Sequence, residues 1–268
     1  MMAEVIGKGL KTVIGMVHLG ALPGTPLYDA AGGFHRLLDA AIADIEALQA
    51  AGIDAVMFGN ENDRPYSLAA PAAQLAAMSA VVAAARPAIR VPFGVNFLWD
   101  PVASVQIAAA TGAAFVREIF TGVYASDMGM WAPDCAGALR ARRDLGRPDL
   151  KLLFNINAEF AAPLDTRPIG LRARSAVFSS LADAILVSGP ITGQPAAQDA
   201  LHEVSAAVPE VPVFANTGVR LDNLEDVFAV ADGCIVGTHF KQGGDTWKPV
   251  DPARVLRFMD EARRLRGR

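Results

Sequence analysis

The chain has 268 residues, of which 52% are hydrophobic and 19% are charged, and its formal net charge is −4. This length and apolar content allow one large buried core and are typical of an eight-unit α/β barrel. The slightly negative charge and the scattered basic residues exclude the electrostatic footprint of a nucleic-acid-binding protein, so we expect no nucleic-acid partner.

Cysteine usage and hydropathy indicate the compartment. Cys135 and Cys234 are the two cysteines, and neither has a second Cys or His at metal-ligand spacing, so we predict neither a disulfide framework nor a zinc site. Residues 1–10 lack the apolar run of a signal peptide, and the alanine-rich stretch 71–85 is interrupted by the polar Gln74. We therefore expect a cytoplasmic protein without membrane insertion.

Short β-branched or aliphatic runs recur along the chain and predict eight strands. In chain order they cover 12–16, 55–58, 92–96, 114–119, 152–156, 184–188, 211–215 and 233–236. The stretches between them are rich in alanine and leucine at helical spacing. Continuously apolar strands that alternate with helices predict a parallel sheet covered by helices. Eight near-equal units favour a single closed (β/α)₈ TIM barrel over 1–268, rather than an open doubly wound sheet.

Polar residues follow the predicted strands, at positions that a closed barrel brings to its carboxyl-terminal mouth. Active sites of this architecture are built at that mouth. The residues predicted to bind substrate there are Asn60, Asn96, Arg117, Asn155, Asn157, Ser188, Asn216 and His239. Within this set we expect the asparagines Asn96, Asn157 and Asn216 to orient hydroxyl groups.

Carboxylates and an imidazole at the same mouth are the candidate catalytic groups. Glu61, Glu118 and Glu159 follow the second, fourth and fifth strands, so three walls of the barrel can present a carboxylate for proton transfer. Glu118 lies inside an apolar run, so an inward side chain must be paired or functional. His18 ends the first strand and is predicted to be a general base, a ligand or a packed imidazole. No cofactor is firmly predicted; a divalent metal held by His18 with Glu61 or Glu159 stays open, without support from an HxH or HExxH spacing.

The loops after the seventh and eighth strands predict a phosphate-binding corner. Gly218 follows the seventh strand, and Gly237 with Thr238 follows the eighth. Glycine lets the backbone approach an anion, and barrels frequently bind phosphate with these two loops, although each glycine could also serve a tight turn. Lys241 would add a point charge or extend into water. It is also the remaining candidate for a Schiff-base lysine, because no lysine ends strands one to seven.

The long segment 121–131 joins the fourth strand to its helix. Its two glycines and two aromatic residues predict a loop that covers the substrate, or a protein interface that uses an exposed Tyr124 and Trp131.

Five segments resemble the BtpA/SgcQ family, and most of all its SgcQ-like branch. They are HLGALPG at 18–24, FGNENDRPY at 58–66, FVREIFTG at 115–122, SGP at 188–190 and ANTGV at 215–219. The resemblance implies a barrel of the phosphate-binding type. SgcQ-like proteins resemble members of sugar-catabolic gene sets, whereas BtpA proteins are associated with photosystem I biogenesis. BtpA-type members carry a Lys-His pair after strand five, where this chain has Asn157-Ala158-Glu159. This difference puts a shared BtpA mechanism in doubt and makes Glu159 a stronger catalytic candidate.

These features predict a sugar-catabolic enzyme that acts on a phosphorylated sugar or a nucleoside-like glycoside. Acid–base chemistry is expected, as an isomerase, epimerase, lyase or hydrolase. The alternative is a non-enzymatic biogenesis, assembly or ligand-sensing protein of the BtpA type, which the fold alone does not exclude. We expect a homo-oligomer, because most oligomeric proteins are symmetric assemblies of one chain.

Overall fold

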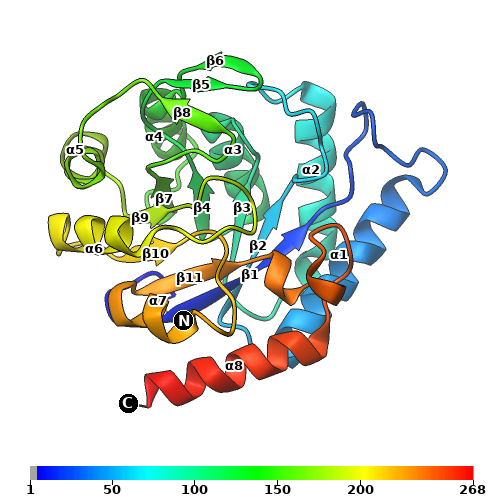
Figure 1. Cartoon of the computed structure of the whole chain (residues 1–268). Coiled ribbons are helices and arrows are strands. Elements are labelled where there is room, and N and C mark those ends of the chain that lie inside the picture. Colours follow the sequence, from blue (N-terminus) through cyan, green and yellow to red (C-terminus); the bar gives the residue numbers. More distant parts are fainter. Residues whose placement is uncertain (1–4, 268) are drawn as a thin grey trace.

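The computed structural model describes residues 5–267, so residues 1–4 of the segment tested for a signal peptide, and residue 268 of the predicted domain, lie outside the described range. Within this range eight parallel strands close into a barrel, in the order β1-β11-β10-β9-β7-β4-β3-β2 (Figure 1). The strands are β1 Thr12–His18, β2 Ala55–Gly59, β3 Phe93–Asn96, β4 Phe115–Glu118, β7 Lys151–Asn155, β9 Ala184–Val187, β10 Val213–Ala215 and β11 Gly233–Val236. All eight predicted strands are confirmed, with small differences at their ends.

Pairing between the first and last strands closes the barrel. Thr12 lies opposite Gly233 and Gly15 lies opposite Val236, in parallel register. An open sheet would leave both of these strands as edges. The TIM-barrel prediction is therefore confirmed, and the open-sheet alternative is wrong.

Helices surround the barrel and alternate with its strands. They are α1 Gly33–Ala50, α2 Ala72–Ala85, α3 Pro101–Thr111, α4 Cys135–Asp144, α5 Ile169–Ser180, α6 Gln198–Ala207, α7 Leu224–Val230 and α8 Pro252–Arg266, with the 3₁₀ helices η1 Arg86–Ala88, η2 Thr238–Phe240 and η3 Gln242–Gly244. Local signals set their ends: the Asp251 carboxylate accepts the Ala253 N–H at the start of α8, and Gly112 ends α3 in the left-handed conformation. None of the helices in 5–267 has the length and apolar character needed to cross a bilayer.

The apolar side chains of residues 5–267 form two large cores and a smaller cluster around Trp99 and Trp131. The outer core lies between strands and helices, and a second core fills the barrel with side chains that include Met16, Phe115 and Phe214. Close packing inside the barrel explains Gly94, because a Cβ there would lie 2.2 Å from the ring of Phe115. The barrel is thus filled below its mouth, which leaves the mouth as the place for a ligand.

A small antiparallel sheet stands on the rim of the barrel. It consists of β5 Tyr124–Ser126, β6 Gly129–Trp131 and β8 Ala161–Pro163, seen at the top of Figure 1. The expectation of exposed Tyr124 and Trp131 is wrong, since both are buried. Trp131 packs edge-on against Trp99, with ring centroids 4.8 Å apart. The segment 121–131 therefore supports the wall of the mouth from behind.

Candidate active site

The two-residue period of the strands brings polar side chains together above the filled part of the barrel. Phe115 and Phe214 point into the barrel, so Arg117 and Asn216, two positions further on, point the same way. Both reach the mouth because the strands are parallel and end on the same side. Met16 and His18 have the same relation on β1.

A pocket with a cavity volume of about 180 Å³ opens at this mouth. The predicted residues that line it are His18, Glu61, Asn96, Arg117, Glu118, Asn155, Glu159, Asn216, Gly218, Gly237, Thr238 and His239. Every candidate catalytic residue is thus brought to one cavity. Residues that sequence reasoning did not single out also line it, among them Tyr66, Trp99, Phe160, Thr192, Arg220 and Arg254.

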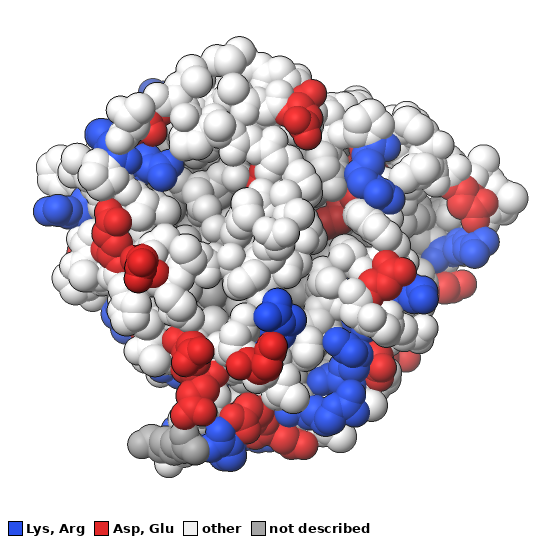
Figure 2. Space-filling view, viewed as in Figure 1, with Lys and Arg blue, Asp and Glu red and all other residues white. Residues whose placement is uncertain are grey.

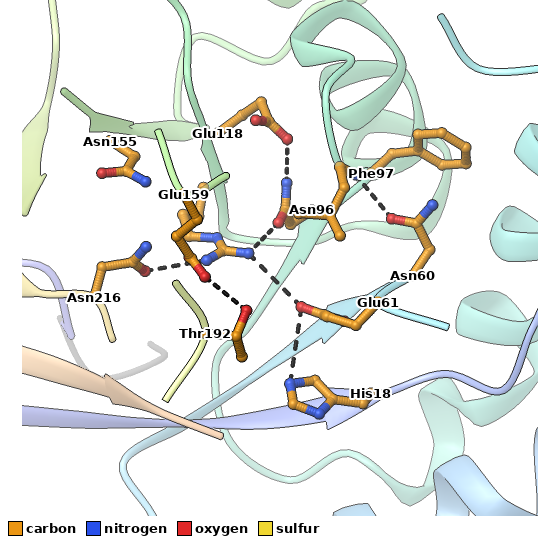
Figure 3. A network of polar contacts seen from close by, with 12 residues as sticks. His18, Asn60, Glu61, Asn96, Phe97, Glu118, Asn155, Glu159, Thr192 and Asn216 are labelled. Atoms are coloured by element: carbon orange, nitrogen blue, oxygen red, sulfur yellow. Dashed lines mark hydrogen bonds and ion pairs between the residues drawn. The ribbon is translucent and has the colours of Figure 1, made fainter. Parts of the chain in front are cut away.

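Arg117 is the centre of a buried polar network, and its partners Glu61, Asn96 and Asn216 are labelled in Figure 3. Its guanidinium donates to Asn96 Oδ1 and, at 3.2 Å, to Asn216 Oδ1, and it lies 3.8 Å from Glu61 Oε1. Because arginine only donates, Asn96 must turn its Nδ2 the other way, where it donates to Glu118 Oε2. The network therefore fixes the orientation of both amides and the position of Glu118.

Glu118 has the electrostatics of a group that exchanges protons near neutral pH. Desolvation by burial raises its pKa to about 7, although the Ile119 N–H donates to Oε1 at 2.8 Å and the nearby Arg117 charge opposes the rise. Burial likewise raises the pKa of Glu61 and that of Glu159. Thr192 Oγ1 donates to Glu159 Oε2 at 2.7 Å. The pocket thus holds three carboxyl groups that each retain a proton more readily than in water.

His18 is neutral in this environment. Burial, with a smaller contribution from the Lys241 charge, lowers its pKa to about 3. Its Nδ1 lies 3.5 Å from the Thr246 carbonyl oxygen, which assigns the proton to Nδ1 and leaves Nε2 as an acceptor, 3.8 Å from Glu61 Oε1. No group of three or more His, Cys, Asp or Glu side chains within 5–267 is arranged to hold a metal ion. The neutral His18 thus leaves an acceptor nitrogen beside Glu61, and the divalent metal that the sequence left open stays a prediction.

Two buried acceptors in the pocket have no partner within the described chain, Glu61 Oε2 and Asn155 Oδ1. The other end of the Asn155 amide donates to Ser188 Oγ at 2.8 Å, which fixes its direction. An unpaired buried acceptor is costly, and ligand donors commonly satisfy such atoms at binding sites. Both residues line the pocket, so these two atoms are candidates for hydrogen bonds with a ligand.

The predicted phosphate corner lies at one side of the pocket. The packing around its two glycines also favours glycine at these positions. A Cβ on Gly218 would lie 2.1 Å from the backbone nitrogen of Pro195, and one on Gly237 would lie 2.9 Å from His18 Cε1. Thr238 Oγ1 is 2.7 Å from Thr246 Oγ1. Each glycine is thus required by a close approach, and both still line the pocket.

Lys241 requires a correction. Its side chain is 1% exposed, and its Nζ donates to Asp44 Oδ2 at 2.6 Å, so it neither extends into water nor faces the pocket. A buried ammonium needs a carboxylate partner, and α1 supplies one. This pairing also removes Lys241 as a Schiff-base candidate.

Arg254, from the first turn of α8, is the cation found instead at the phosphate corner. Its Nε donates to the His239 carbonyl oxygen at 2.6 Å, and its Nη2 lies 3.4 Å from His239 Nδ1. Among residues 5–267 no carboxylate forms an ion pair with it. Burial and the Arg254 charge lower the pKa of His239 to about 4, so this imidazole is neutral and its Nδ1 accepts. Arg220 also lines the corner, paired with Asp222 at 3.1 Å.

Three predicted substrate-binding residues lie behind the pocket wall. Asn60 donates to Asp63 and accepts the Leu98 N–H at 2.8 Å. Asn157 donates to the Ser188 carbonyl oxygen, and Ser188 Oγ accepts from Asn216 at 2.7 Å. Through these hydrogen bonds, the three side chains fix the positions of loops and of amide side chains that line the pocket.

Comparison with known proteins places the chain in a family. A family model described as the BtpA family matches residues 9–264. The putative sgc region protein SgcQ of Escherichia coli K12 is 46% identical over 263 residues, covering 98% of each chain. The photosystem I biogenesis protein BtpA of Synechocystis is 31% identical over 251 residues, covering 92% of this chain and 86% of that protein.

Solved structures share the fold at low sequence identity. The structure described as native KDPGal is 17% identical and superposes with a TM-score of 0.58, covering 94% of this chain and 95% of that one. This likeness concerns the barrel architecture, whereas the relatives above match in sequence along nearly the whole chain. The family resemblance of the five sequence segments is confirmed: the chain belongs to the BtpA family.

Proposed function

We propose that this protein is a sugar-catabolic enzyme that uses acid–base chemistry on a phosphorylated sugar or a nucleoside-like glycoside. The reaction class would be isomerisation, epimerisation, elimination or hydrolysis. One observation carries the proposal: Glu61, Glu118 and Glu159, all with raised pKa, surround Arg117 in one pocket. Pairs of titratable groups with displaced pKa values are characteristic of acid–base sites.

Glu118 would carry the proton in this mechanism. A general acid or base works best when its pKa lies near the working pH, and a pKa of about 7 meets that condition. Arg117 would stabilise negative charge that develops on the substrate, as a preorganised donor in a site largely closed to water. Glu61 Oε2 and Asn155 Oδ1 would accept hydrogen bonds from substrate hydroxyl groups.

The phosphate would lie at the corner formed by Gly218, Gly237 and Thr238, beside Arg254. A guanidinium without a carboxylate partner is suited to a phosphate, because it can donate two parallel hydrogen bonds. His239, with its proton on Nε2, would add a neutral donor.

A thermal-shift screen tests the proposal. Pentose, hexose and nucleoside phosphates would be compared with their unphosphorylated forms, and each stabilising compound would then be assayed for turnover. Stabilisation confined to phosphorylated compounds, followed by turnover, is the expected result. Stabilisation by free sugars to the same extent, or by no compound, would contradict it.

The alternative remains a ligand-sensing or assembly protein of the BtpA type, favoured by the 31% identity to a protein named for photosystem I biogenesis. Stabilisation by a phosphorylated ligand that is never turned over would favour the sensing role. A homo-oligomer stays a prediction.

A further inference from the structure

The pocket has three aromatic side chains in its lining that the chemistry proposed above does not use. Tyr66, Trp99 and Phe160 line it, and they come from the loops after β2, β3 and β7. Leu98 and Ile119 extend the same apolar lining. Hydroxyl groups and a phosphate would find partners in the asparagines, carboxylates and Arg254, so the rings indicate a further, apolar part of the ligand.

Phe160 has an unusual backbone conformation for a bulky residue, and its N–H donates to the Pro190 carbonyl oxygen at 3.2 Å. Its φ is 55°, in the left-handed region that bulky residues rarely adopt. Trp99 shares this feature with a φ of 73°, but its burial and its packing on Trp131 compensate for the strain. Phe160 is 40% exposed, so side-chain packing offsets less of its backbone strain. Strained residues of this kind gather at ligand-binding sites, where the ligand contact is the benefit.

The size of the cavity indicates where each of the two parts of the ligand would bind. Its volume of about 180 Å³ corresponds to roughly six water molecules, so a ligand with a ring beside its sugar phosphate extends beyond this space. A further ring would therefore lie at the opening, where the exposed face of Phe160 stands. The unpaired acceptors Glu61 Oε2 and Asn155 Oδ1 belong to the enclosed part.

We infer, resting on the proposed function, that the substrate is a phosphorylated glycoside whose planar ring stacks on Phe160 and Tyr66 while its sugar faces Glu61 and Asn155. The shared chemistry is a flat π-system linked to the sugar at the end opposite the phosphate. A nucleobase and an aryl aglycone both satisfy it, because stacking on an aromatic side chain tolerates different rings.

Calorimetric titration with two matched ligand pairs tests the inference. The pairs are ribose 5-phosphate with uridine 5′-monophosphate, and glucose 6-phosphate with 4-nitrophenyl β-glucoside 6-phosphate. We expect the ring-bearing member of at least one pair to bind about tenfold more tightly than its parent sugar phosphate. A gain in the first pair assigns a nucleobase, and a gain in the second assigns an aryl aglycone.

Variants of Phe160 separate the ring from the backbone. Phe160→Ala and Phe160→Gly should both abolish the preference for the ring-bearing ligand and leave the affinity for the parent sugar phosphate unchanged. Phe160→Gly should melt at a higher temperature than Phe160→Ala, because glycine suits the φ of 55°. Phe178→Ala is the matched control, since Phe178 is 89% exposed on α5 and should leave all affinities unchanged.

Equal affinities within both pairs, or a preference that survives in Phe160→Ala, would overturn the inference. In that case the sugar phosphates still bind, and the proposed function stands. Failure of all four ligands to bind would overturn the proposed function together with this inference.

Discussion

In the proposed mechanism, Glu118 combines a structural role with a chemical one. Its carboxylate accepts hydrogen bonds from Asn96, the Trp99 N–H at 3.2 Å and the Ile119 N–H, so three donors surround it. Glutamine would turn an NH₂ group toward some of these donors. We expect Glu118→Gln to lower the rate at least about 10²-fold and the free energy of unfolding by about 1–3 kcal/mol. Turnover assays and urea unfolding would measure the two effects, and an unchanged rate would remove Glu118 from the mechanism.

The pH dependence of stability gives an independent check on Glu118. Burial raises the folded-state pKa from 4.5 to about 7, so the folded protein binds this proton more tightly than the unfolded chain does. The stabilisation is complete below pH 4.5 and is lost as the pH rises through 7, on the order of a few kcal/mol. Urea unfolding at pH 5 and pH 8 should show a larger loss for the wild type than for Glu118→Gln. Equal losses would mean that the carboxyl group titrates normally.

Arg254 is the residue on which charge recognition would depend. Arg254→Gln should weaken the binding of a phosphorylated sugar by about 10- to 100-fold, because a charge-assisted hydrogen bond is lost. The affinity for the unphosphorylated sugar should not change. Arg257→Gln, one turn along α8 and exposed, is the matched control. A loss of both affinities in Arg254→Gln would indicate a structural effect through its bond to His239.

At the level of elements, the loops after the strands are shaped by contacts with one another. The loop after β9 passes so close to Gly218 that a Cβ would meet the backbone of Gln194 and Pro195. The β5-β6-β8 sheet supports Trp99 from outside in the same way. The geometry of the pocket is therefore a property of neighbouring loops rather than of single turns.

Two glycines of equal φ test this account of the loops. Gly218 and Gly243 both have a φ of 64°, but a Cβ on Gly243 would meet open space. Gly243→Ala should cost about 1–2 kcal/mol for the left-handed backbone alone. Gly218→Ala should cost about 1–3 kcal/mol more, because the loop after β9 must move. Chemical denaturation compares the two, and equal costs would show that the close approach is unimportant.

At the level of the whole molecule, the Lys241–Asp44 pair connects the last barrel loop to the first helix. Asp44 also accepts the Val250 N–H at 2.7 Å, so one carboxylate holds two points of the segment between β11 and α8. Figure 2 shows the contrasting arrangement at the surface, where acidic and basic side chains are interspersed around the edge and the lower part of the visible face. Surface pairs of that kind contribute little, whereas a buried pair is costly to break.

Lys241→Met should therefore destabilise the fold by about 3–5 kcal/mol, because it leaves the Asp44 carboxylate buried without its partner. The affinity of the folded fraction for a sugar phosphate should be retained. Urea unfolding and calorimetry would measure the two quantities. A stable variant with lost phosphate affinity would restore the ligand-binding role predicted from the sequence.

The eight strands, the closed barrel and most of the residues at its mouth follow from the amino-acid sequence alone. These features depend on the spacing of apolar residues within each segment and on where each strand ends. Because all the strands are parallel, the last inward-facing residue of each strand lies at the same rim of the barrel, as Arg117 does two positions after Phe115. Arg220, two residues after Gly218, and Trp99, three after Asn96, could have been found by the same reasoning. The prediction of one domain over 1–268 stays a prediction.

Which of these polar groups face the pocket depends on the tertiary structure. Lys241 pairs with Asp44, 197 positions away, and Trp131 packs behind Trp99. Arg254 reaches the pocket from a helix that follows the last strand. Such contacts depend on how helices and loops pack around the barrel. The residue pattern within one segment does not reveal which side chain of a distant segment will pack against it in the folded protein.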